Sequence, residues 1–170
     1  MFYEAARGHG LPHDPLKAIV SPRPIGWISS QSARGELNLA PYSFFNAFNY
    51  KPPIVGFCSV GSKDSVRNVT DTREFAWNLV TRPLAERMNL TSAAVPSVVD
   101  EFALAGLTPA PSRLIAPPRV QESPVSFECR VTQIVQLAGK ENRLVVGEVV
   151  GVHMRDDCLV DGIFDVTRFN

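Results

Sequence analysis

The sequence contains few cysteines. Cys58, Cys129 and Cys158 are the three among 170 residues, and they lie far apart in the chain. They form no CxxC pair, so the spacing typical of a zinc knuckle or a dithiol redox motif is missing. Two of them lie in the apolar runs GFCSV and VSFECRV. We therefore interpret the thiols as buried and reduced.

The sequence also lacks a long apolar run and an excess of charge. No run approaches the ~20 apolar residues of a membrane helix. The N-terminus, MFYEAARGHGLPHDP, has neither the basic start nor the apolar stretch of a secretory signal. The 17 basic and 17 acidic side chains give a formal net charge of zero, so no overall basic field attracts nucleic acid or an anionic membrane. We expect a cytoplasmic protein that binds neither nucleic acid nor membrane.

Several catalytic motifs are missing as well. The sequence has no GxGxxG, GxxxxGK[ST], HExxH or GxSxG. A Rossmann dinucleotide site, a phosphate loop, a zinc protease and a conventional hydrolase therefore have no support from sequence motifs. His9, His13 and His153 are too scattered to propose a metal site. His153 is the one candidate for acid–base chemistry, and the simpler interpretation is an ordinary histidine at a strand end.

The sequence is rich in proline and in short apolar segments. Proline accounts for 14 of the 170 residues, about 8% against a usual ~5%. The prolines cluster at residues 21–24, 51–53 and 116–118, where they separate strands because proline cannot donate to a sheet. Strands are predicted at residues 25–30, 37–40, 43–48, 54–60, 75–80, 125–137 and 144–153, with a hairpin connection at 138–142.

Helical signals are fewer. We predict a helix that begins near residues 62–64 and ends near 72, capped by Ser62 or Asp64. A second helix is predicted over 83–93 and a short helical turn over 100–106. Because strands dominate and runs such as PIGWISS are apolar nearly throughout, the sequence predicts one mainly β domain over residues 1–170, a β-barrel or sandwich with a few peripheral helices.

The first segment with chemical potential is Gly61-Ser62-Lys63-Asp64-Ser65, between a predicted strand and a predicted helix. A helix N-terminus leaves backbone N–H groups unpaired and carries partial positive charge. Two serine hydroxyls and the lysine ammonium add further donors, which together can hold a terminal phosphate. By its spacing alone, the segment fits an ordinary capped surface helix better.

Two further segments combine apolar and small polar residues. In Trp27-Ile28-Ser29-Ser30, an apolar run ends in two hydroxyls, which can lie along a flat cofactor. Residues 40–48, APYSFFNAF, can form an apolar wall whose backbone amides face the polar edge of a ring. In both segments the alternative is a hydrophobic core with a polar strand end.

Taken together, RPIGWISS, NLAPYSFFNAF, PPIVGFCSV and GSKDSVRN resemble the flavin reductase-like FMN-binding proteins, and later segments such as EFAWNLV, DEFALAGLTPAPS and LVVGEVVGVH fit the same family. The resemblance covers residues 16–170 in order and spacing. It implies the FMN-binding split β-barrel and a non-covalently bound FMN. Members of this family usually continue for a few tens of residues beyond the position of Asn170, so we interpret the C-terminus as truncated.

The resemblance also implies roles for individual residues. Ser29 and Ser30 would contact the flavin or its ribityl chain. The isoalloxazine ring would be lined, partly through main-chain atoms, by Ser43, Phe44, Phe45 and Asn46.

The phosphate end of the cofactor would lie at the start of the first predicted helix. Lys63, Asp64 and Ser65 match the Lys-Asp-Thr/Ser element of the family, in which the lysine and the hydroxyl hold the phosphate and the aspartate orders the loop. Ser59 and Gly61 would run beside the ribityl chain.

The function implied is an NAD(P)H:flavin oxidoreductase. Reduced nicotinamide would bind transiently and pass hydride to flavin, which would then serve a partner oxygenase or another acceptor. The alternatives are a flavin-binding electron carrier without nicotinamide-dependent turnover and a structural protein whose aromatics are only core. The resemblance further implies a homodimer, because sites in this fold usually lie at the subunit interface.

Overall fold

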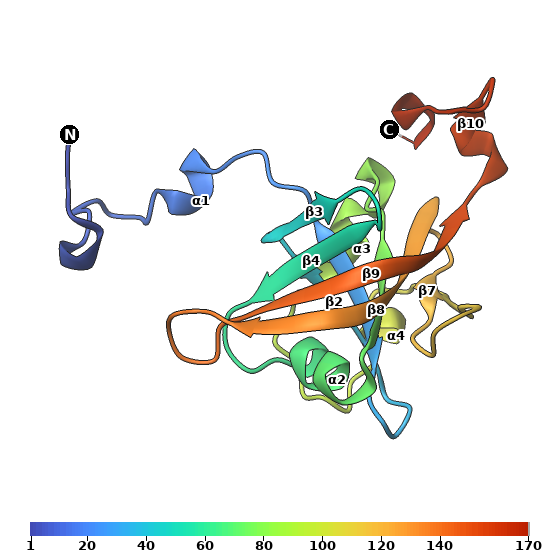
Figure 1. The fold of residues 1–170 in the computed structure, drawn as a ribbon, viewed down its shortest axis with the longest axis horizontal. Coiled ribbons are helices and arrows are strands. Elements are labelled where there is room, and N and C mark those ends of the chain that lie inside the picture. The colour runs from blue at the N-terminus through green and yellow to red at the C-terminus, as the bar shows by residue number, and fades with distance from the viewer. Residues whose placement is uncertain (170) are drawn as a thin grey trace.

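A computed structural model describes residues 1–169 of the chain, and its main element is one seven-stranded antiparallel sheet (Figure 1). The sheet consists of β1 (Gly26–Gln31), β2 (Leu37–Tyr42), β3 (Phe45–Asn49), β4 (Ile54–Ser59), β5 (Glu74–Asn78), β8 (Val125–Gln136) and β9 (Arg143–Met154). Two small ribbons pair β6 (Pro109–Ala110) with β7 (Arg119–Val120) and β10 (Leu159–Val160) with β11 (Ile163–Phe164). The α-helices are α1 (Leu16–Ile19), α2 (Asp64–Thr72), α3 (Ala85–Leu90) and α4 (Glu101–Leu104), and 3-10 turns cover Ala5–Arg7, Arg82–Leu84, Asp156–Cys158 and Val166–Phe169.

The order of the strands explains how the sheet closes. It runs β2-β1-β5-β8-β9-β4-β3, so β2 and β3 occupy the two edges. In the chain these two strands are separated by only Ser43 and Phe44. The carbonyl of Phe44 accepts a hydrogen bond from the amide of Cys58 on β4 at 2.8 Å. The chain thus passes directly from one edge of the sheet to the other, and the sheet curls into a barrel, as predicted.

Strand β1 is buried on both faces. On β1 the side chain of Ile28 packs inside the barrel with Phe57, Phe75 and Val145. The neighbouring Trp27 points to the opposite face, because side chains alternate along a strand. It packs there in a second cluster whose other buried members are Leu39, Leu84, Phe102, Ala105, Leu107 and Val120. This arrangement explains why the segment PIGWISS is apolar nearly throughout.

The predicted helices are present with some differences. Helix α2 begins and ends as predicted, and the short turn over residues 100–106 appears as α4, which Asp100 caps by accepting the amide of Phe102. The helix predicted over 83–93 ends already at Leu90. The hydroxyls of Thr91 and Ser92 bond back to the carbonyls of Met88 and Asn89 at 2.7 and 2.6 Å and so satisfy the last turn.

The remaining predictions concern the cysteines and the strands. Cys129 and Cys158 are buried, Cys58 is half-buried, and all three thiols are free. The hairpin connection at 138–142 joins β8 and β9 through a bond from the amide of Leu137 to the carbonyl of Asn142 at 2.8 Å. The two-residue strands β6, β7, β10 and β11 were not predicted, because two residues carry no periodic pattern.

The two ends of the chain extend away from the barrel (Figure 1). The N-terminal arm carries the exposed apolar side chains of Phe2, Leu16 and Ile19. In the part of the chain that the structure describes, no helix is long and apolar enough to cross a bilayer.

Candidate flavin site

The loop between β4 and α2 presents the start of the helix without a side-chain cap. Gly61 takes a left-handed conformation with φ +79°, which glycine adopts without strain. Lys63 occupies the N-cap position in an extended conformation, and among residues 1–169 no side chain caps the first turn. The prediction that Ser62 or Asp64 caps the helix was therefore wrong. Asp64 is the first helical residue, and its carboxylate pairs with Arg67 one turn later.

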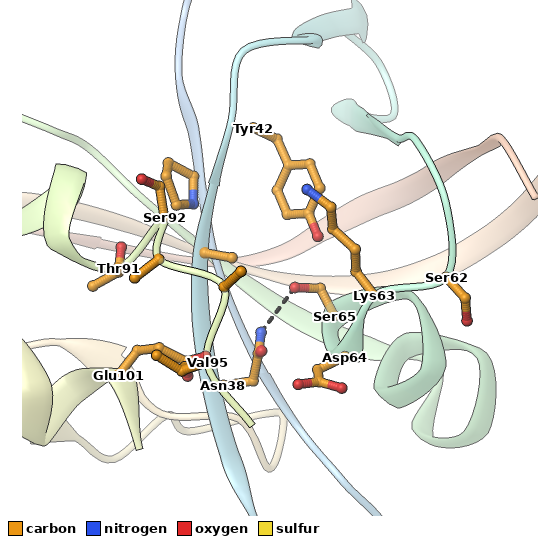
Figure 2. Close-up of a pocket in the computed structure, with 14 residues that line it drawn as sticks. Asn38, Tyr42, Ser62, Lys63, Asp64, Ser65, Thr91, Ser92, Val95 and Glu101 are labelled. Atoms are coloured by element: carbon orange, nitrogen blue, oxygen red, sulfur yellow. Dashed lines mark hydrogen bonds between the residues drawn. The ribbon is translucent and has the colours of Figure 1, made fainter. Parts of the chain in front are cut away.

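A cavity of about 350 Å³ opens at this helix start (Figure 2). Three other parts of the chain complete its wall: the edge strand β2, the loop that follows α3, and Glu101 of α4. The lining residues are Asn38, Ala40, Pro41, Tyr42, Ser62, Lys63, Asp64, Ser65, Thr91–Val95 and Glu101. Of the eleven residues that the sequence analysis assigned to the cofactor, this cavity brings together Lys63, Asp64 and Ser65.

Two buried asparagine side chains donate hydrogen bonds to serine hydroxyls beside and behind this cavity. Asn38 donates from Nδ2 to Ser65 Oγ at 2.8 Å and to Ser30 Oγ at 3.3 Å, and Asn68 donates to Ser30 Oγ at 3.3 Å. Ser30 is fully buried and does not line the cavity. The structure therefore places Ser30 behind the wall, where it positions the two asparagines, and a direct contact with a cofactor stays a prediction.

Tyr42 is a residue of this site that the sequence analysis treated only as part of an aromatic segment. Its ring packs on Phe57 at 4.7 Å between centroids, and the ammonium of Lys63 lies 5.7 Å from its centroid (Figure 2). Its hydroxyl is buried and has no hydrogen-bond partner among the described residues. Burial raises the pKa of this phenol, and the nearby hydroxyls of Ser65 and Ser59 act in the opposite direction. A buried, unpaired hydroxyl beside a cavity is costly unless a ligand completes it.

Glu101 is the second residue that the sequence analysis missed. Its side chain is buried, and one carboxylate oxygen accepts the amide of Leu39 on the edge strand β2 at 3.1 Å. Burial raises the pKa of Glu101; the bond from Leu39 opposes this, and the charges of Asp64 and Asp100 add to it. Thr91, which also lines the cavity, accepts the indole N–H of Trp27 at 3.0 Å and so anchors the loop that follows α3.

The other predicted residues lie beside the cavity or under it. Ser29 and Ser59 are buried in β1 and β4, and the hydroxyl of Ser29 has no partner among the described residues. The predicted ring-binding segment follows Tyr42 at the junction of β2 and β3 and does not line the cavity. In this segment Ser43 is half-buried, Phe44 and Asn46 are exposed, and Phe45 stacks on Trp77 at 5.6 Å between centroids.

His153 is neither a lining residue of this cavity nor one of the residues predicted to bind the cofactor. It lies in β9 next to the strand end, and its Nε2 is hydrogen-bonded to the buried carboxylate of Glu128 on β8. It does not line the cavity at α2, and its role stays a prediction.

Comparison with known proteins identifies the family. The model of the flavin reductase-like domain matches residues 20–164. The chain therefore belongs to the flavin reductase-like domain family, as its sequence segments indicated.

Individual relatives agree with this assignment. An uncharacterised protein of Aquifex aeolicus is 40% identical over 151 residues, which cover 85% of this chain and 76% of that protein. Nitrilotriacetate monooxygenase component B from Bacillus cereus superposes with a TM-score of 0.82 at 29% identity, over 88% of this chain and 79% of that chain. A putative flavin reductase with a split barrel domain from Shewanella frigidimarina superposes with a TM-score of 0.79 at 26% identity, over 86% and 75%. The barrel described above is thus a split barrel of the flavin reductase type.

Proposed function

We propose that this protein binds FMN in the cavity at the start of α2 and acts as an NAD(P)H:flavin oxidoreductase. The observation that carries the proposal is the start of α2, which has no side-chain cap among the described residues and where Lys63, Ser65 and Tyr42 line one cavity. Backbone N–H groups, an ammonium and hydroxyls are the donors that a terminal phosphate takes. When bound, the flavin supplies the redox chemistry, accepting hydride from reduced nicotinamide.

The protein's own residues would hold the cofactor rather than react with it. Lys63 and the first-turn N–H groups of α2 would bind the phosphate, together with the hydroxyl of Ser65. The ion pair of Asp64 with Arg67 would reduce the repulsion between this carboxylate and a bound phosphate. The ribityl chain would run past Ser59, Gly61 and the layer of Ser29 and Ser30. From there the ring would reach the segment from Ser43 to Asn46 at the junction of β2 and β3.

The surface supports the proposal of a homodimer. An almost wholly apolar groove of about 360 Å³ lies over β3, β4 and β9, where Tyr50 and Val152 are 82% and 55% exposed. Apolar patches of this kind on a protein surface mark interaction sites. A second copy of the chain is the occupant we propose, and the molecular mass of the flavin-loaded protein in solution tests it.

The test of the function is an absorption spectrum of the purified protein, recorded before and after FMN is added and the excess removed. We expect a retained flavin spectrum and oxidation of NADH or NADPH that depends on it. Parallel titrations with FAD and riboflavin decide which flavin is preferred. Bound flavin without turnover with either nicotinamide would leave the electron-carrier alternative. A protein that binds no flavin would contradict the proposal.

A separate oxygenase is the acceptor that we propose for the reduced flavin. The support is the similarity to a protein named as the B component of a monooxygenase. Transfer would be tested by adding a flavin-dependent oxygenase component and comparing hydroxylated product with nicotinamide consumed.

Lys63→Ala is expected to weaken FMN binding by roughly 10- to 100-fold, because a charge-assisted hydrogen bond contributes about 1.5–3 kcal/mol. Riboflavin has no phosphate, so its affinity should change by less than about threefold. Flavin fluorescence titrations measure both constants. Lys140→Ala, in the exposed hairpin between β8 and β9, is the matched control and should alter neither. Equal weakening of FMN and riboflavin would show that Lys63 does not bind the phosphate.

A further inference from the structure

A second polar cavity, of about 330 Å³, lies at the end of β9 and shares no residue with the cavity at α2. It is formed by the loop between β6 and β7, Arg119 of β7, the loop between β7 and β8, and the chain from the last residues of β9 to Arg155. The lining residues are Arg113, Arg119, Gln121, Ser123, Pro124 and Val152–Arg155. Three arginines and one histidine therefore line this cavity, although the protein as a whole has no formal net charge.

Two of these arginines have no acidic partner. Arg155 forms an ion pair with Asp157. Within residues 1–169, neither Arg113 nor Arg119 takes part in an ion pair. The guanidinium of Arg119 makes one hydrogen bond, from Nε to the carbonyl of Pro111 at 3.3 Å. Most donors of these two arginines thus remain available to a ligand.

The buried acid near the cavity forms no direct ion pair with either guanidinium group among the described residues. Glu128 is 1% exposed, and its two oxygens accept the amides of Arg113 and Leu114 at 2.8 and 2.6 Å. It also pairs with the ring of His153. A carboxylate has about four acceptor positions, and three of them are used by these donors. Glu128 therefore holds the walls of the cavity in place through these direct partners, and its charge reaches Arg119 without a hydrogen bond.

The electrostatics of the cavity favour an anion. The pKa of Arg119 is lowered first by burial; the charge of Glu128 opposes this effect, and the charge of Arg113 adds to it. A partly desolvated cation beside a like charge is unfavourable until an opposite charge arrives. The guanidinium fork also matches the geometry of phosphate and carboxylate oxygens.

We propose that this cavity is a second, separate binding site for a phosphate group, with Arg113 and Arg119 as its contact residues and His153 at its wall. The group is either free inorganic phosphate or the phosphate of a nucleotide. Two unpaired guanidinium groups match the double charge of a phosphate better than the single charge of a carboxylate.

Calorimetric titration of the full chain with inorganic phosphate, in a phosphate-free buffer of low ionic strength, tests the site. All proteins carry Lys63→Ala, so that binding at α2 is weakened and is the same in every variant compared. We expect saturable binding that Arg113→Gln weakens at least tenfold. The side chain of Arg113 makes no hydrogen bond or ion pair among the described residues, so this variant should fold normally. Arg82→Gln is the matched control, because Arg82 is exposed and lies outside the cavity.

The same titration with adenosine monophosphate distinguishes the two sources of the phosphate. Binding at least tenfold tighter than that of inorganic phosphate would assign a nucleotide to the site. Equal or weaker binding would assign the free ion. The proposal is overturned if the protein binds neither compound, or if Arg113→Gln has no more effect than Arg82→Gln. None of these outcomes depends on flavin binding, so the experiment tests this proposal independently of the proposed function.

Discussion

Glu128→Gln is expected to lower the free energy of unfolding by about 3 kcal/mol. The carboxylate of Glu128 receives two peptide N–H groups and the ring of His153 in a fully buried position. A glutamine amide has one oxygen, so its NH₂ group must face a donor and at least one buried N–H loses its partner. Chemical denaturation followed by circular dichroism measures the change.

Glu101→Gln is the matched control for this prediction. Glu101 is also a buried glutamate, but its one described partner is the amide of Leu39, which the oxygen of a glutamine can still accept. Burial raises the pKa of Glu101, so removal of its charge relieves a cost. We expect a change below about 1 kcal/mol. Equal destabilisation by the two substitutions would contradict the role given to the hydrogen bonds of Glu128.

The two glutamates should also differ in the sign of their pH dependence. Burial alone would raise the pKa of Glu128, but the bonds from His153, Arg113 and Leu114 outweigh it and hold the pKa below the ordinary 4.5. Its contribution to stability is therefore present above pH 4.5 and is lost as the pH falls through the lowered value. The pKa of Glu101 lies above 4.5, so its contribution is present below pH 4.5 and is lost as the pH rises through the raised value.

Gly147→Ala is expected to destabilise the barrel by about 2–3 kcal/mol. A Cβ at this position would lie 2.6 Å from Cε1 and 2.8 Å from Cζ of Phe75, and 3.3 Å from the carbonyl of Arg130. Phe75 is fully buried inside the barrel and packs edge to face on Phe57, so its ring has no room to withdraw. Thermal unfolding followed by circular dichroism measures the loss.

Gly151→Ala, four residues later on the same strand, is the control. A Cβ there would meet Glu128 and Leu114 at 3.4 Å, an ordinary contact. The added methyl also reduces the freedom of the unfolded chain, so we expect a neutral effect or a gain of up to about 1 kcal/mol. A loss in Gly151→Ala as large as that in Gly147→Ala would show that β9 needs flexibility rather than space.

The local pattern of the sequence determined much of the barrel and one end of the flavin site. Apolar runs bounded by proline marked β1 and β4, and the order of glycine, lysine and serine between a strand and a helix marked the start of α2. These features depend on residues close together in the chain, where backbone preference and side-chain period decide the structure. The family resemblance rests on the same local segments, and the match of the family model to residues 20–164 confirmed it.

Only the tertiary structure decided which distant residues share a site. The loop between β6 and β7 covers one face of β8 and buries the carboxylate of Glu128 against His153. Likewise Tyr42 and Glu101 come to line one cavity with the start of α2 only once the sheet has closed. Strand register and sheet closure set such pairings, because contacts between residues many positions apart leave no period in the sequence.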